Sequence, residues 1–136
     1  MAEQKHAFTK LTELIEDYKN NKDSFDASKL QSLREDIALT LFYLSDSASQ
    51  SIANYDAAEH VRKSKMAERE QFYRNDTDNE GKRITATEAQ NLARIDCKEE
   101  VEKSKNALRQ KERVRIILNS TNQILNALAS RISQIQ

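Results

Sequence analysis

The sequence predicts an all-α fold: a long antiparallel helical hairpin, resembling a coiled coil, preceded by a short amphipathic helix. Three observations lead to this fold class. The chain of 136 residues has no proline, and its single glycine, Gly81, lies in a polar stretch. Apolar residues recur at helical spacing on both sides of that stretch. Charged residues make up 32 % of the chain and apolar residues 38 %, which is typical of long helices.

The first expected element is a short helix over residues 2–20. Its apolar face consists of Phe8, Leu11, Leu14, Ile15 and Tyr18. The polar residues 20–24 end this helix, and the first long helix is expected over residues 27–75. Either Asp26 or Ser28 can cap its start, since both are side chains that accept hydrogen bonds from the first helical N–H groups.

The first long helix carries an apolar stripe that thins after residue 58. The stripe consists of Leu30, Leu33, Ile37, Leu41, Leu44, Ala48, Ile52 and Tyr55. These positions follow an eleven-residue rhythm rather than a heptad, which predicts a helix that is nearly straight.

The turn between the long helices is expected over residues 76–85. Asp76, Asp78 and Gly81 resemble the start of a calcium loop, but Thr87 occupies the twelfth position, where a bidentate glutamate is required. We therefore expect a polar turn without a metal ion.

The second long helix is expected over residues 86–135 and begins at a capping-box pattern formed by Thr85 and Glu88. Its apolar residues become dense toward the C-terminus. This second stripe consists of Val114, Ile117, Thr121, Ile124, Leu128, Ile132 and Ile135. Once the chain folds back, the two stripes meet, and the first helix can join them as a third member. We expect one domain over residues 1–136.

Self-association is expected to supply part of the stability, because an elongated hairpin buries less surface than a globular domain of the same length. We assign the oligomer contact to four residues of the second stripe and expect assembly beyond a dimer. These residues are Ile117, Ile124, Leu128 and Ile132.

Several protein classes are disfavoured by what the chain lacks. Cys97 is the only cysteine, which excludes an intramolecular disulfide framework and fits a reducing compartment. The N-terminus lacks the apolar core of a signal peptide, and no apolar run is long enough to span a membrane. We therefore expect a soluble, cytoplasmic protein. No GxSxG, HExxH, CxxC or phosphate-binding glycine loop occurs, so we expect no enzyme, cofactor or metal.

Basic residues concentrate in the middle of a chain whose net charge is zero. Residues 60–115 hold fifteen Lys/Arg against eleven Asp/Glu, and the remainder holds seven against eleven. Cations that follow phosphates, interleaved with rings that accept unstacked bases, suit single-stranded nucleic acid. The candidate DNA-binding residues are Arg62, Lys63, Lys65, Arg69, Phe72, Tyr73, Arg74, Lys82 and Arg83. A second, interrupted basic row consists of Arg94, Lys98, Lys105 and Arg109.

The alternative interpretation of these charges is a solvated surface with ordinary ion pairs one turn apart on each helix. It predicts a structural or scaffolding coiled-coil protein, or an adaptor that docks into another protein, without nucleic-acid affinity. The two hypotheses differ in one structural property: the basic side chains either face outward or pair with carboxylates of the same chain.

Two stretches of the chain resemble the UvsY-type recombination mediators of bacteriophages. One is the basic stretch that ends in Ala67-Glu68-Arg69, followed by Phe72-Tyr73 and the polar turn. The other is Ile124-Leu125-Asn126-Ala127-Leu128-Ala129-Ser130-Arg131 in the last helix. The resemblance covers about residues 40–134, and residues 1–30 show no clear match.

The resemblance implies a small all-helical protein of the host cytoplasm that assembles into rings of six or seven subunits. Such mediators bind single-stranded DNA and help to load a RecA-like recombinase onto strands coated by single-strand-binding protein. By this match, Lys63, Lys65, Arg69 and Tyr73 become DNA-binding candidates, and the C-terminal helix would carry the oligomer contact.

Overall fold

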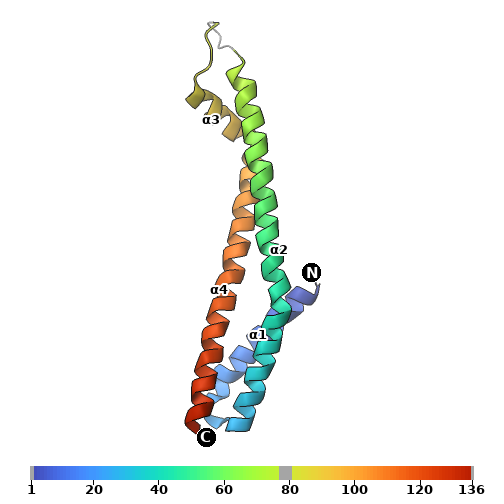
Figure 1. Cartoon of the computed structure of the whole chain (residues 1–136), viewed down its shortest axis with the longest axis vertical. Coiled ribbons are helices and arrows are strands. Elements are labelled where there is room, and N and C mark those ends of the chain that lie inside the picture. The colour runs from blue at the N-terminus through green and yellow to red at the C-terminus, as the bar shows by residue number, and fades with distance from the viewer. Residues whose placement is uncertain (1, 77–80, 136) are drawn as a thin grey trace. The chain divides into compact units, whose positions relative to one another are not determined.

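The computed structural model describes residues 2–76 and 81–135 and confirms the all-α fold class. The chain forms α1 (Ala2–Asn21), a 3-10 turn (Lys22–Ser24), α2 (Ala27–Arg74), α3 (Ala86–Asp96) and α4 (Lys98–Ile135) (Figure 1). It divides into two compact units. Unit 1 comprises residues 1–50 and 113–136, and unit 2 comprises residues 51–112.

Two helices begin at the side-chain caps that the sequence indicates. Of the two alternatives for α2, the cap is Asp26, whose Oδ1 accepts a hydrogen bond from the backbone N–H of Lys29 at 2.8 Å. Thr85 caps α3 by accepting from the N–H of Glu88 at 3.2 Å. Such caps satisfy N–H groups that have no partner within the helix.

Gly81 has a φ angle of 78°, in the left-handed region that glycine tolerates, as a polar turn at this point requires. Residues 77–80 of the expected turn, including Asp78, lie outside the described part of the chain.

The expected helix over residues 86–135 is wrong in one respect, because it is interrupted at Cys97. This residue has φ −99° and ψ 20° and separates α3 from α4. The hydrogen-bond ladder still passes through it, since its N–H donates to Ala93 and its carbonyl accepts from Val101, both at 2.9 Å. The interruption directly follows Asp96, whose side chain is bound by α2.

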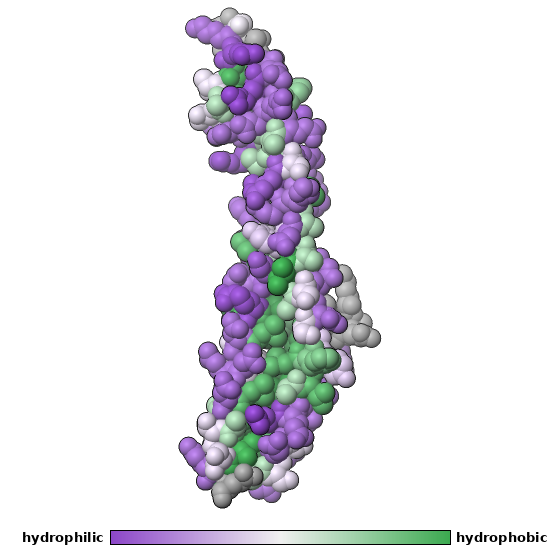
Figure 2. Space-filling model, in the orientation of Figure 1, coloured by the Kyte–Doolittle hydropathy of each residue, from purple (hydrophilic) through white to green (hydrophobic). Residues whose placement is uncertain are grey.

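Unit 1 is a three-helix core in which α1 joins α2 and α4. Its buried residues are Ala7 and Leu11 from α1, Leu30, Leu33, Ile37 and Leu44 from α2, and Leu128 and Ile132 from α4. Figure 2 shows hydrophobic residues gathered over unit 1 on the visible face, whereas unit 2 is mostly hydrophilic there.

Beyond Ile37 the eleven-residue rhythm predicted for α2 is wrong except at Leu44, which is buried as predicted. In unit 1 the buried positions of this helix are Leu30, Leu33, Ile37, Thr40, Leu44 and Ser47, which alternate steps of three and four as in a heptad. Ile52, which the rhythm includes, is 46 % exposed. The small polar side chain of Thr40 fits the seam because its hydroxyl donates to the carbonyl of Asp36 at 2.8 Å.

The four residues assigned to the oligomer contact take part in the core of unit 1. Leu128 and Ile132 are buried, and Ile117 and Ile124 pack against the same cluster. They therefore hold α4 against α1 and α2 within one unit, and their part in a contact between copies stays a prediction. Thr121, on the same stripe, is buried and donates its hydroxyl to the carbonyl of Ile117 at 2.7 Å.

Candidate nucleic-acid interface

The basic row on α2 that the sequence assigns to DNA is paired with carboxylates of unit 2. Arg62 contacts Glu59 at 2.6 Å, one turn earlier on the same helix. Lys65 contacts Glu100 at 2.7 Å, and Arg69 contacts Asp96 at 2.7 Å. In the two pairs that link α2 to a later part of the chain, the number of the acidic partner falls from 100 to 96 as that of the cation rises from 65 to 69. In this unit the chain therefore runs back antiparallel to α2, as the predicted hairpin requires.

Arg69 is the centre of the most connected of these pairs. Its Nε donates to Asp96 Oδ2 at 2.8 Å, and the Tyr73 hydroxyl donates to the same oxygen at 2.6 Å. The guanidinium also lies over the rings of Phe72 and Tyr73, 4.4 and 5.2 Å from their centroids. The Tyr73 hydrogen bond first, and then that from Arg69, lower the pKa of Asp96. This cluster fastens the end of α3 to α2.

The other two pairs are tied in the same way. Glu59 accepts from Arg62 and also from the Ser104 hydroxyl of α4 at 2.5 Å. The hydrogen bond from Lys65 lowers the pKa of Glu100, whose side chain is only 13 % exposed. A phosphate that bound Lys65 would leave the mostly buried carboxylate of Glu100 without its ion-pair partner. The negative charges of the phosphate and of Glu100 would also repel each other. Binding DNA through this row therefore opposes the packing of unit 2.

The basic excess of residues 60–115 disappears when charges are counted over the compact unit. Residues 51–112 contain thirteen Lys/Arg and thirteen Asp/Glu. The surplus in the longer window came from Arg113 and Arg115, which belong to unit 1, and from leaving out Asp56 and Glu59. Unit 2 is electrically neutral as a whole, so only a local arrangement of cations can attract an anion.

The remaining candidates differ from one another. Within the described chain, Lys63, Arg74 and Arg83 have no carboxylate at ion-pair distance. Lys82 already has an interaction partner. Phe72 is 55 % exposed even though Arg69 stacks on it.

The second basic row is divided by the interruption at Cys97. Arg94 lies on α3, whereas Lys98, Lys105 and Arg109 lie on α4. Lys105 is 4.0 Å from Glu102. The interrupted row that the sequence predicts on one helix is therefore divided between two helices.

The structure reveals a set of partners that sequence reasoning missed: Glu59, Asp96, Glu100 and Ser104. Each lies opposite a candidate cation or beside it, on the side of the helix that faces the neighbouring helix. The heptad register of the two long helices is the signal that could have found them, because it predicts which positions meet across the seam.

Acid is expected to destabilise unit 2 between pH 4.5 and about 2. The pKa of Glu59 is lowered from 4.5 to about 2, first by the hydrogen bond from Arg62 and then by that from Ser104. A carboxyl with a lower pKa in the folded state stabilises fully above its unfolded pKa, and this contribution disappears as the pH falls through the folded value. Thermal unfolding followed by circular dichroism across this range tests it.

The matched variant for this titration is Glu59→Gln. It should be less stable than the wild type near neutral pH, and the difference should shrink on acidification. If the two proteins lost stability in parallel, Glu59 would have no part in the acid response.

No metal centre accompanies these carboxylates: no group of three His, Cys, Asp or Glu side chains in the described residues is arranged to hold an ion. Cys97 is buried, and burial raises the pKa of its thiol. No described helix has an apolar stretch long enough to cross a lipid bilayer.

No family model matches this chain, and no curated protein or solved structure matches it either. The resemblance to the phage mediators therefore stays a prediction.

Proposed function

We propose that this chain is a non-catalytic helical scaffold protein that works by binding copies of itself through unit 1. The observation that carries the proposal is an exposed apolar surface on α2. Leu39 is 55 % exposed, Phe42 71 % and Tyr43 66 %. The rings of Phe42 and Tyr43 are in edge contact, with centroids 5.9 Å apart, so they form one aromatic surface. Contiguous exposed apolar patches of this kind mark interaction sites.

An uncharged hollow adjoins this surface. Its volume is about 370 Å³, and its lining residues are Ala38, Leu41, Phe42 and Ser45 from α2 and Leu118, Asn122 and Leu125 from α4. Because no charged side chain lines it, another chain can cover it without burying an unpaired charge.

Charge complementarity within unit 1 favours a second copy as the partner. The part of α4 in this unit carries Arg113, Arg115 and Arg131 and no acidic residue. The part of α2 beside the exposed apolar residues carries three acidic residues, Glu35, Asp36 and Asp46, against one arginine, Arg34. Ile116, next to the first two arginines, is 54 % exposed. A contact between these two different surfaces is heterologous, and such contacts build rings or filaments rather than closed dimers.

The wild-type chain is therefore expected to scatter light as a species larger than a dimer at micromolar concentration. Replacing both Phe42 and Tyr43 by serine should lower the measured mass, because it removes the aromatic surface. Phe72→Ser is the matched control, since it removes an exposed ring from unit 2, and it should leave the mass unchanged. A monomeric wild type would contradict the proposal.

A second candidate function is the recombination mediator, which binds single-stranded DNA with a RecA-like recombinase and single-strand-binding protein as partners. What favours it is the group of cations without acidic partners in the described chain, Lys63, Arg74 and Arg83, together with the exposed ring of Phe72. Several weak sites on an oligomer would act together through effective concentration. Binding to oligo-dT should then weaken as salt rises, and affinity independent of salt would remove this candidate.

The scaffold is the first candidate for two reasons. The main basic row is paired within unit 2, and that unit has no net charge. Both features are expected if the charged side chains of unit 2 form ion pairs between helices and keep the outer faces of these helices solvated.

A further inference from the structure

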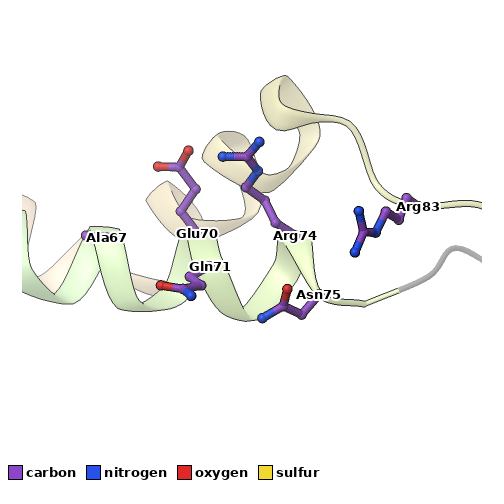
Figure 3. Close-up of a pocket in the computed structure, with 6 residues that line it drawn as sticks. All are labelled: Ala67, Glu70, Gln71, Arg74, Asn75 and Arg83. Atoms are coloured by element: carbon purple, nitrogen blue, oxygen red, sulfur yellow. The ribbon is translucent and has the colours of Figure 1, made fainter.

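An open, polar hollow lies beside the last two turns of α2. It has a volume of about 400 Å³, and its lining residues are Ala67, Glu70, Gln71, Arg74, Asn75 and Arg83. Figure 3 shows Arg74 and Asn75 at the end of α2, and Arg83 on the segment before α3 with its side chain directed back toward that end. Two arginine residues from separate segments therefore border one space, and the Arg74 side chain lies on the same side of α2 as Glu70.

Neither guanidinium is already engaged within the described chain. The side chains of Arg74 and Arg83 make no ion pair, hydrogen bond or ring contact there, unlike those of Arg62 and Arg69 of the same unit. The amide side chains of Gln71 and Asn75 are also without a hydrogen-bond partner among the described residues. The residues that line the hollow thus include two arginines and two amide side chains, all of which can donate N–H groups to a ligand.

These donors match a phosphate group. A guanidinium presents parallel N–H groups that pair with two oxygens of a phosphate, and amide N–H groups bind the remaining oxygens. A carboxylate ligand has only two oxygens and would leave donors unused.

Two features of the hollow disfavour the binding of an anion. Glu70 carries a negative charge, and the carbonyl end of α2 adds a partial negative charge. The positive charge of one arginine is therefore cancelled by these negative charges, and a net attraction for an anion requires both arginines.

We infer that Arg74 and Arg83 together form a binding site for a phosphate group, supplied either as a free ion or by a nucleic-acid backbone. The site lies in unit 2 and is independent of the self-association proposed for unit 1. Its strength depends on both arginines, and Glu70 weakens it.

The test is a titration of the full chain with inorganic phosphate in one arm and with oligo-dT in the other. Arginine Nε–H resonances are followed by nuclear magnetic resonance in the wild type, and affinities are compared with those of variants. Arg74→Gln and Arg83→Gln should each weaken binding about tenfold or more, the loss expected for one charge-assisted hydrogen-bonded group. Glu70→Gln should strengthen it. Arg109→Gln, another exposed arginine of unit 2, should change nothing.

Phosphate binding that depends on both arginines supports the site, and an oligo-dT response with the same dependence identifies a nucleic-acid backbone as a source. Phosphate binding without oligo-dT binding supports the site and removes the mediator function. Oligo-dT binding that both variants leave intact, without phosphate binding, overturns the site and leaves the mediator standing. Equal losses in Arg74→Gln and Arg109→Gln also overturn it, and circular dichroism confirms that each variant is folded.

Discussion

Leu128→Ala is expected to lower the free energy of unfolding by about 2–5 kcal/mol. Leu128 is fully buried in the core of unit 1, where it packs with residues of α1 and α2. Removing its side chain forfeits apolar burial and leaves a cavity that three helices cannot easily close. Urea unfolding monitored by circular dichroism measures the change.

The matched control is Leu108→Ala, the same substitution on the same helix at a position that is 39 % exposed. Its cost should be about 0.5 kcal/mol, as for surface sites without special contacts. If Leu128→Ala were equally mild, Leu128 would not be a core residue. A role for this side chain in an interface between copies, as the sequence predicts, would then be favoured.

Ala93→Leu is expected to lower the free energy of unfolding by about 1–3 kcal/mol. Ala93 and Ala89 are the buried residues of α3, and both have no exposed surface. A leucine at this position has no space and must displace its neighbours. The displacement should also disturb the nearby tie between Asp96 and Arg69.

Ala86→Leu provides the comparison, because Ala86 begins the same helix and is exposed. It should leave stability nearly unchanged. If Ala93→Leu left stability unchanged, α3 would not pack against the rest of unit 2. The interruption at Cys97 could then not be explained by the packing of α3.

The sequence was sufficient to predict the helices, because propensity and capping are local properties. The polar residues 20–24, the caps at Asp26 and Thr85, and the glycine at residue 81 mark every boundary between helices in the described chain except one. The exception is the boundary at Cys97. It follows Asp96, which contacts Arg69 of α2, a residue distant in the sequence.

The buried seam was only partly predictable. Leu30, Leu33 and Ile37 were predicted correctly as buried positions. Beyond them the prediction chose larger apolar residues, such as Leu41 and Ile52, over the smaller residues that are buried. Thr40 and Ser47 occupy the seam instead. A hydropathy pattern gives no weight to a polar residue such as Thr40, whose hydroxyl donates to the carbonyl of Asp36 on the same helix.

The candidate site was predicted least well. A row of cations on a helix looks the same whether it faces solvent or an acidic partner, and the partners of Lys65 and Arg69 lie 35 and 27 residues away. Only the register between the helices determines whether such a row faces solvent or an acidic partner. The unpaired arginines near the turn belonged to the predicted set, but nothing in their spacing distinguished them from the paired ones.

The most direct measurement is oligo-dT affinity and thermal stability in a variant with Arg62, Lys65 and Arg69 all changed to glutamine. If these residues are internal ties, the variant should melt at a lower temperature, and its affinity for oligo-dT should equal that of the wild type at every salt concentration. A variant that melts like the wild type but loses oligo-dT binding would contradict this, and the row would then be a nucleic-acid surface.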